Sequence, residues 1–347
     1  MKININLLPK IIILFICFSA CNQNYEESTG YIMTVNGKIS PEQMGISLPH
    51  EHITTDFIGA EKVKQPQYQQ DSAVEIILPH LNKLLENGVN TLFECTPNYI
   101  GRDVKLLQRL SELSQINIIT NTGYYSAVDK KFLPAHAYTE TKEEISAHWE
   151  KEWMEGINGT GIKPGFIKLG VGKGKLDSIE VKLLEAAILL SKKSGLTIAM
   201  HTGDGEAAKD EQRILEANGL ESGQMIWVHA QNGTDEEREL LAKKGVWVSL
   251  DGISEKRIEE YLQMVSYLKE KNLLHQLLIS HDDGWSVENN DGEISLKLFG
   301  NGNSKPYSTI FEIFVERLTF AGFTRDEITQ IMVENPKKAY VIDPIGN

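Results

Sequence analysis

Short apolar runs rich in β-branched residues recur along the chain, each followed by a polar or glycine-containing turn and then by an amphipathic stretch of helical period. The apolar runs are residues 46–50, 91–95, 117–121, 166–169, 197–201, 226–229, 246–250 and 277–280. The helical stretches between them are residues 71–86, 103–114, 141–155, 178–193, 206–218, 235–244 and 255–271. Alternating strands and helices predict an α/β fold with a parallel sheet, and eight strands are the number that closes a (β/α)8 TIM barrel.

Two more helical stretches, residues 308–320 and 324–333, follow the last run, and the second begins with the capping pattern Thr324-Arg325-Asp326-Glu327. We expect them to cover the outside of the barrel and to close its last unit. From about residue 33 onward, no low-complexity tract, heptad repeat or Pro/Gly/Ser linker interrupts the pattern. The sequence therefore predicts a single domain over residues 33–347.

Residues 1–20 are set apart by a different pattern. Lys2 and Lys10 flank a polar start, and the apolar run 11–18 is far shorter than the ~20 residues needed to cross a bilayer, which is typical of a secretion signal. The small residues before Cys21 resemble the cleavage and lipid-attachment site of bacterial lipoproteins, although Phe18 stands where a smaller aliphatic residue is usual. The resemblance implies cleavage before Cys21, a lipid on Cys21, a tether over 21–32 and a place in the cell envelope, lipid-anchored or periplasmic. Ordinary cleavage without lipid is the alternative.

Composition narrows the class of protein further. Hydrophobic residues make up 41% of the 347 positions, enough for a sizeable core. The 35 Lys and Arg against 48 Asp and Glu give a net charge of −13, which disfavours a nucleic-acid partner because phosphates would be repelled. Removal of Cys17 and modification of Cys21 would leave Cys95 alone, so no intramolecular disulfide is expected. Stability must then come from the core.

Most of the apolar runs end in a polar or ionisable residue, which an open doubly wound sheet would not require. These residues are His50 with His52, Glu94, Asn121 with Tyr124, Lys168, His201, His229, Asp251 and Asp282. In a closed barrel, the carboxyl ends of all strands meet at one rim, where active sites lie. Side chains that are far apart in the sequence are therefore expected to converge.

Four of these strand-end residues are histidines, which suggests a metal site. His50 and His52 are two positions apart, so in an extended chain both imidazoles point to the same face. Taken singly, this pair could be a surface accident, and His201 or His229 could be a buried histidine with satisfied hydrogen bonds. Four imidazoles and the Asp282 carboxylate together suit zinc, manganese or cobalt better than the oxygen-seeking magnesium or calcium.

The fourth strand offers Lys168 where a second ion would need a bridging anion. A lysine whose pKa is lowered can add carbon dioxide and become a carbamate with two ligand oxygens. With Lys168 included, the chain resembles the phosphotriesterase-related branch of the amidohydrolase superfamily over nearly its whole globular part. The motifs that carry the resemblance are residues 45–52, Gly101-Arg102-Asp103-Val104, His201-Thr202-Gly203, Ser280-His281-Asp282 and Glu334-Asn335-Pro336.

The resemblance implies a role for each residue of the predicted centre. His50, His52 and Asp282 would hold the more buried ion, His201 and His229 the more exposed one, and N6-carboxylated Lys168 with a hydroxide would bridge two divalent ions, zinc or else manganese or cobalt. Asp282 would also be the proton acceptor. The expected reaction is hydrolysis of a small-molecule lactone, carboxylic ester or phosphotriester, with an N-acyl amide as the alternative. A homodimer is also expected.

Residues around the centre are candidates for substrate binding. Tyr124 and Tyr125 follow the third strand, and Tyr124 is the candidate donor of a hydrogen bond to the substrate. Segment 283–306 is long and rich in turn residues, so we expect a loop that covers the pocket, with Trp285 as a substrate wall. Ordinary packing is the alternative for both aromatic residues. Arg102 and Asp103 are expected to form an ion pair.

Two other readings of the barrel remain open. Lys168 could stay a free amine that forms a Schiff base, as in lysine-dependent aldolases, although the four strand-end histidines argue against this. The chain could also be an envelope lipoprotein that uses the barrel for binding without catalysis. The content of divalent metal after purification without chelator separates the binding protein from the hydrolase.

Overall fold

The computed structural model describes residues 30–63 and 66–343, and these form a (β/α)8 barrel. The barrel strands are β3 (Ile46–Glu51), β5 (Val89–Glu94), β6 (Asn117–Ile119) with β7 (Asn121–Thr122), β8 (Phe166–Gly170), β9 (Ile198–His201), β10 (Met225–Val228), β11 (Trp247–Asp251) and β12 (Leu277–Ser280). All eight predicted strands are confirmed, and the third is divided into two short pieces. They pair in parallel in the order β3-β5-β6 and β7-β8-β9-β10-β11-β12.

The barrel closes where its first and last strands meet. The backbone N–H of Asp282 donates to the carbonyl of His50 at 3.2 Å, and the Ser280 hydroxyl accepts from the N–H of His50 at 3.1 Å. Glu51, on the opposite face from the two histidines, accepts from the Ser280 hydroxyl and the His281 ring, each at 2.8 Å. Glu51 and His281 therefore contact each other and do not line the cavity at the rim.

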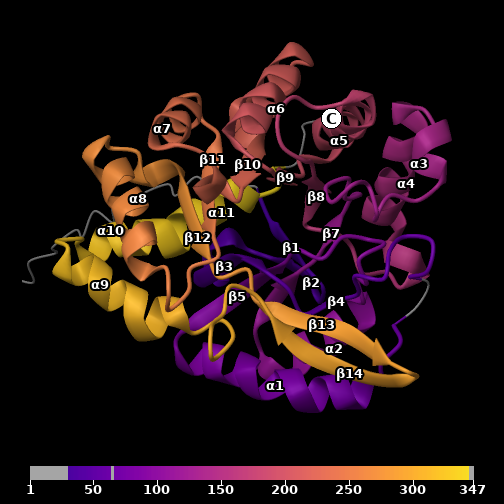
Figure 1. The fold of residues 1–347 in the computed structure, drawn as a ribbon, viewed down its shortest axis with the longest axis horizontal. Coiled ribbons are helices and arrows are strands. Elements are labelled where there is room, and N and C mark those ends of the chain that lie inside the picture. Colours follow the sequence, from indigo (N-terminus) through magenta and orange to yellow (C-terminus); the bar gives the residue numbers. More distant parts are fainter. Residues whose placement is uncertain (1–29, 64–65, 344–347) are drawn as a thin grey trace, which may run out of the picture.

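The helices surround the strands, from α1 and α2 at the bottom of Figure 1 through α5, α6 and α7 to α8. They are α1 (Gln70–Glu86), α2 (Val104–Ser114), α3 (His136–Thr139), α4 (Lys142–Glu155), α5 (Ser178–Ser194), α6 (Gly205–Ala217), α7 (Asp235–Lys243), α8 (Ile258–Glu270), α9 (Val315–Phe320), α10 (Arg325–Thr329) and α11 (Asn335–Tyr340). Single π-helical turns, Ile310–Phe314 and Gln330–Glu334, precede α9 and α11. The predicted capping box at Thr324 is confirmed. Within the described part of the chain, no helix has the length and apolar character to cross a membrane.

A small hairpin that the sequence pattern did not predict joins the two ends of the domain. Strands β1 (Ile32–Thr34) and β2 (Gly37–Ile39) pair antiparallel, and Tyr31 bonds to Ile342 through both backbone groups. Inside the barrel, the ring of Phe93 stacks on that of Tyr340 with centroids 3.8 Å apart. Aromatic side chains therefore pack inside the barrel, and the rim at the strand carboxyl ends is where a (β/α)8 barrel carries its active site.

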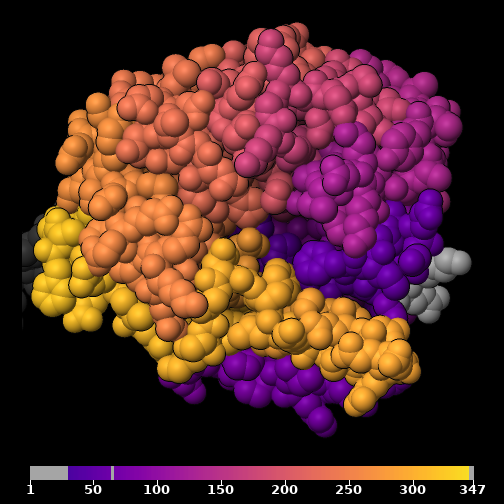
Figure 2. Space-filling view, in the orientation of Figure 1, coloured from indigo at the N-terminus to yellow at the C-terminus, as the bar shows by residue number. Residues whose placement is uncertain are grey.

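Segment 283–306 is largely a second hairpin, whereas the sequence predicts a long, turn-rich loop over the pocket. Strands β13 (Gly284–Asn290) and β14 (Glu293–Phe299) pair antiparallel around the turn residues Asp291 and Gly292, which have φ of +54° and +94°. Strand β13 also pairs in parallel with β4 (Thr54–Thr55), which follows the first barrel strand. The hairpin is thereby fixed beside the mouth of the barrel, and Figure 2 shows the surface hollowed next to its orange strands.

Candidate active site

The six residues predicted as metal ligands all line one cavity of about 340 Å³ at the carboxyl ends of the strands. They are His50, His52, Lys168, His201, His229 and Asp282. The strand register explains this convergence. Gly170 lies opposite His201, and His201 lies opposite Val228, the residue before His229. The structure thus brings together residues that are more than 230 positions apart in the sequence.

Asp282 lies between two histidine rings. Its Oδ1 is 3.3 Å from Nε2 of His50 and 3.2 Å from Nε2 of His52, and one ligand atom from each of the three residues lies within 4.8 Å of the others. These three side chains could therefore hold a metal ion. Asp282 has φ of +59° and His229 has φ of +63°, a conformation that few non-glycine residues adopt and that is concentrated at functional sites.

The other two histidines and Lys168 form the second half of the group. The rings of His201 and His229 have centroids 4.4 Å apart. Burial, with Lys168 nearby, lowers the pKa of His201 to about 3, and burial together with His201 lowers the pKa of His229 well below its usual value. Both rings are therefore neutral, which is the form that binds metals.

Lys168 is buried, and its ammonium group has no carboxylate partner among the described residues. Its Nζ donates only a long hydrogen bond of 3.4 Å to the Leu169 carbonyl. Burial lowers the pKa of Lys168. A larger share of the side chain is therefore an uncharged amine, the form that can react with carbon dioxide.

Side chains outside the predicted set hold the histidines in place. Asp251 Oδ2 lies 3.4 Å from Nδ1 of His50 and accepts from the backbone N–H of His229 at 2.9 Å. Nδ1 of His52 is 2.8 Å from the hydroxyl of Thr96. Orienting groups of this kind are typical of metal-binding histidines. The sequence marked Asp251 as a strand-end residue without assigning it a role, and Thr96, in a loop, carried no signal.

The electrostatics of the centre follow from these neighbours. Burial alone would lower the pKa of His50, but Asp251 and Asp282 raise it to about 9. Burial alone would raise the pKa of Asp282, but His50 and His52 hold it well below its usual value. The carboxylate of Asp282 is therefore ionised throughout the neutral range and can act as a ligand or as a proton acceptor.

The walls of the cavity are mainly apolar and come from loops and from the hairpin. They include Phe57, Ile100, Tyr125, Val128, Phe132 and Phe299. The ring of Phe299 lies 5.7 Å from that of His52 and 5.6 Å from that of Phe57, measured between centroids. Apart from the six predicted ligands, Lys131 is the only charged residue among the described residues that line this cavity, and it is exposed.

Neither of the two aromatic residues predicted to bind substrate, Tyr124 and Trp285, lines the cavity. Tyr124 is buried, with its hydroxyl 3.0 Å from Nε2 of His136, whereas the next residue, Tyr125, lines the cavity with its ring centroid 5.0 Å from that of His201. Trp285 is buried in the hairpin base against Tyr307, with centroids 5.6 Å apart. The hairpin contributes Phe299 to the cavity in its place.

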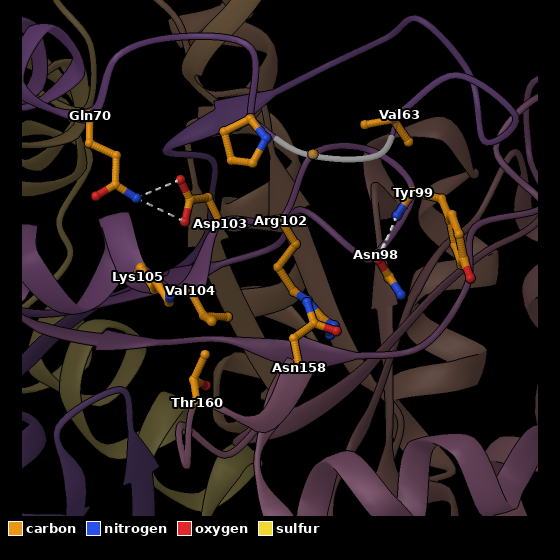
Figure 3. Close-up of a pocket in the computed structure, with 12 residues that line it drawn as sticks. Val63, Gln70, Asn98, Tyr99, Arg102, Asp103, Val104, Lys105, Asn158 and Thr160 are labelled. Atoms are coloured by element: carbon orange, nitrogen blue, oxygen red, sulfur yellow. Dashed lines mark hydrogen bonds between the residues drawn. The ribbon is translucent and has the colours of Figure 1, made fainter.

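The expected ion pair between Arg102 and Asp103 does not form either. Arg102 pairs with Glu152 at 2.6 Å, while Asp103 caps α2 and accepts from the hydroxyl of Tyr68 at 3.2 Å. Arg102 and Asp103 border a second cavity of about 400 Å³, where Figure 3 shows Gln70 donating to Asp103. No histidine or cysteine is among the described residues that line it. The metal-ligand cavity is therefore the candidate active site.

Comparison with known proteins agrees with this arrangement. The model of the phosphotriesterase family matches residues 30–340. An aryldialkylphosphatase of Saccharolobus solfataricus is 25% identical over 315 residues, covering 87% of this chain and 96% of that protein. A phospho-furanose lactonase of Mycoplasmopsis synoviae is 26% identical over 339 residues, covering 91% of this chain and 93% of that protein.

The fold has close counterparts among solved structures. An organophosphorus hydrolase from Deinococcus radiodurans superimposes with a TM-score of 0.78 over 89% of this chain and 96% of that protein, at 24% sequence identity. At that identity the likeness concerns the fold, and it agrees with the barrel that the strand pattern predicts.

Proposed function

The chain belongs to the phosphotriesterase family and is a metal-dependent hydrolase, and we propose that it cleaves an uncharged, apolar lactone or carboxylic ester. One observation carries the proposal: six metal-type donors share a cavity with walls of aromatic and aliphatic side chains. The alternatives are a phosphotriester and an N-acyl amide, which present a similar electrophile to the same donors.

The donor set fits a pair of divalent cations, for which we propose zinc, with manganese or cobalt as alternatives. His50, His52 and Asp282 would hold one ion, and His201 and His229 the other. When bound, two such cations lower the pKa of a shared water and polarise the oxygen of the electrophile. The five residues named here are thus of the type that can hold the two cations needed for hydrolysis.

We further propose that Lys168 is N6-carboxylated, and that its carboxylate would help to hold the two ions. Its buried position, its lowered pKa and the lack of a described carboxylate partner support this modification. The carboxylated side chain is an anion, so it would offset part of the positive charge of two cations. Carbon-13 NMR of the folded protein, loaded in ¹³C-labelled bicarbonate, would detect the carbamate carbon, and Lys168→Ala should lack that signal.

Two side chains of the cavity would take part in the reaction itself. Asp282 is ionised and accepts the proton of the attacking water. Burial raises the pKa of Tyr125, so its hydroxyl stays protonated and can donate a hydrogen bond to the substrate. The remaining wall residues exclude water from the substrate and select its apolar part.

The charge of the cavity supports an uncharged substrate. Lys131 is the one charged side chain, among those described, that borders the cavity outside the six predicted ligands, and it lies exposed at the rim. The net charge of the chain is −13, which disfavours the approach of a highly anionic substrate. A phosphorylated lactone would depend on Lys131 alone, whereas an apolar lactone would contact several aromatic rings.

A hydrolysis screen tests the proposal. Purified protein, loaded with zinc or manganese in bicarbonate, is assayed on apolar and phosphorylated lactones, aryl esters, phosphotriesters and N-acyl amides. We expect the highest kcat/KM on apolar lactones or aryl esters. A higher value on any of the other classes would replace the proposed substrate. Lack of turnover on every class, by protein shown to contain both ions, would overturn hydrolysis of this range of bonds.

We also propose that the protein is held in the bacterial cell envelope by a lipid on Cys21. The support is the sequence pattern of residues 1–21, which lie outside the described residues. Labelling of cells with radioactive palmitate tests it: the wild-type protein should be labelled and Cys21→Ser should not. Equal labelling of the two proteins would contradict the attachment site.

A further inference from the structure

A second group of potential metal ligands lies outside the active-site cavity. It consists of His136, Glu140 and His148, each of which offers one ligand atom within 4.8 Å of the others. His148 Nε2 is 3.1 and 3.0 Å from the two carboxylate oxygens of Glu140, and the rings of His136 and His148 have centroids 5.3 Å apart. We propose that these three side chains form a separate binding site for one zinc ion.

The donor set suits zinc. Two imidazoles and a carboxylate leave a fourth tetrahedral position for water, a frequent arrangement around this ion. His136 begins α3, and Glu140 caps its end, with its backbone N–H bonded to the carbonyl of His136; His148 lies on α4. Small movements of side chains that are partly or largely exposed would bring the three donors to ligand distance.

The charges around the site favour a cation. Glu143 and Glu144 lie in the first turn of α4, about one turn before His148 on the same helix. Lys182 donates to the backbone carbonyls of Tyr138 and Glu140 and not to the Glu140 carboxylate. Among the ion pairs of the described residues, Glu140 appears only with His148. A divalent cation would therefore neutralise the Glu140 carboxylate, whose partner in the described structure is the His148 ring.

Tyr124 links this site to the active-site cavity. Its hydroxyl is 3.0 Å from Nε2 of His136, so Nδ1 of His136 is taken as the ligand and Nε2–H would donate to Tyr124. The segment between Tyr124 and His136 also carries Tyr125, Val128, Lys131 and Phe132 of the cavity wall. The zinc ion would therefore hold the segment between Tyr124 and His136 against α4. It would affect substrate binding through the position of this segment, without contact with the reacting atoms.

Metal counting on the whole chain tests the site. Wild-type protein, His148→Ala, Glu140→Gln and the control His275→Ala are dialysed against the same buffered zinc concentration, and bound zinc is measured by mass spectrometry. His275 is an exposed histidine on the short turn Leu274–Gln276, outside the cluster. We expect wild type and His275→Ala to hold one more zinc per chain than His148→Ala or Glu140→Gln. Equal zinc content in all four proteins would overturn the proposal.

A second pair of variants separates this site from the active site. In the His201→Ala background, which removes a proposed active-site ligand, adding His148→Ala should still lower the zinc content by one ion per chain. Added zinc should also raise the melting temperature of wild type more than that of His148→Ala. If His148 and Glu140 form only an ordinary hydrogen bond, zinc should not raise the melting temperature of wild type more than that of His148→Ala. That result, together with equal zinc content, would overturn the zinc site.

Discussion

The metal centre and the cavity wall belong to the same cavity but are built from different parts of the fold. The histidines and Lys168 of the centre lie on, or directly after, the barrel strands β3, β8, β9 and β10, and Asp282 follows β12. The wall residues lie on the connecting segments after β3, β5 and β7 and at the end of the second hairpin. His50 is 1% exposed, whereas Phe57 and Val128 in the wall are 43% and 60% exposed.

This difference indicates that the metal centre determines the reaction and that the cavity wall determines which substrate is bound. The centre is held by parallel strand pairing and by buried partners such as Asp251 and Glu51, so its geometry depends on the core. The wall is held mainly by contacts between aromatic rings, such as that of Phe57 with Phe299. Changes in the centre should therefore abolish the reaction, and changes in the wall should shift substrate preference.

The largest effect is expected at the centre, from Asp282→Asn. An amide cannot accept the proton of the attacking water, so kcat should fall by a factor on the order of 10²–10⁴. Metal content should be largely kept, because the amide oxygen can still be a ligand. Steady-state kinetics and metal analysis on the same sample check this. Unchanged kcat with full metal content would remove Asp282 as the proton acceptor.

The same contrast explains how much could be predicted from the sequence. Eight strands, and the convergence of six strand-end side chains in one cavity, could be predicted, because an apolar run that ends in an ionisable residue has a clear physical meaning in a closed barrel. Tyr124 and Tyr125 are neighbours, and beyond the end of a strand the chain has no fixed alternation to tell which of them faces the cavity. The structure, and not the pattern, assigns that place to Tyr125.

The second hairpin was missed for a similar reason. Ile294, Leu296 and Leu298 alternate with polar residues, as in a strand, but they lie in a segment rich in glycine and asparagine, which predicts turns. Its pairing with β4 depends on a contact between residues about 230 positions apart, which one sequence does not reveal. Trp285 is consequently buried in the hairpin base rather than in the cavity.

The next effect is expected from the group that supports the centre. Asp251→Asn removes the negative charge 3.4 Å from Nδ1 of His50, so metal affinity should fall by about 10- to 100-fold, with kcat restored by excess zinc. Competition with a chelator measures the affinity. Ser249→Ala is the control, because it removes another partner of Asp251 and leaves the contact with His50 in place. Equal affinity in Asp251→Asn and wild type would show that His50 needs no support.

Metal binding should also depend on pH in a defined direction. Asp251 and Asp282 raise the pKa of His50 to about 9, and a histidine must lose its proton to bind a cation. Below that pKa, apparent zinc affinity should therefore rise by about tenfold for each unit of pH, if one proton is displaced. Chelator competition over a pH series, with proton release followed by an indicator dye, checks this. A flat profile would mean that His50 is already neutral.

A change in the wall should leave the metals alone and alter the substrate. Phe57→Ala removes an exposed aromatic ring, so kcat/KM for substrates with long apolar chains should fall by about tenfold, while short substrates are little affected. Phe320→Ala, which removes an even more exposed ring outside the cavity, is the matched control. An equal loss for long and short substrates would mean that the wall supports the centre rather than selecting the substrate.

The smallest and sharpest comparison is between the adjacent tyrosines. Tyr125→Phe removes a hydroxyl from the cavity and should lower kcat/KM several-fold, whereas Tyr124→Phe removes the hydrogen bond to His136 and should cost about 1 kcal/mol of stability with little change in kinetics. Kinetics and thermal unfolding of both variants test this division. If Tyr124→Phe lowered kcat/KM as much as Tyr125→Phe, the hydroxyl of Tyr124 would affect substrate binding through the neighbouring wall residues. Tyr124 would then belong to the residues that determine substrate preference, although it is buried.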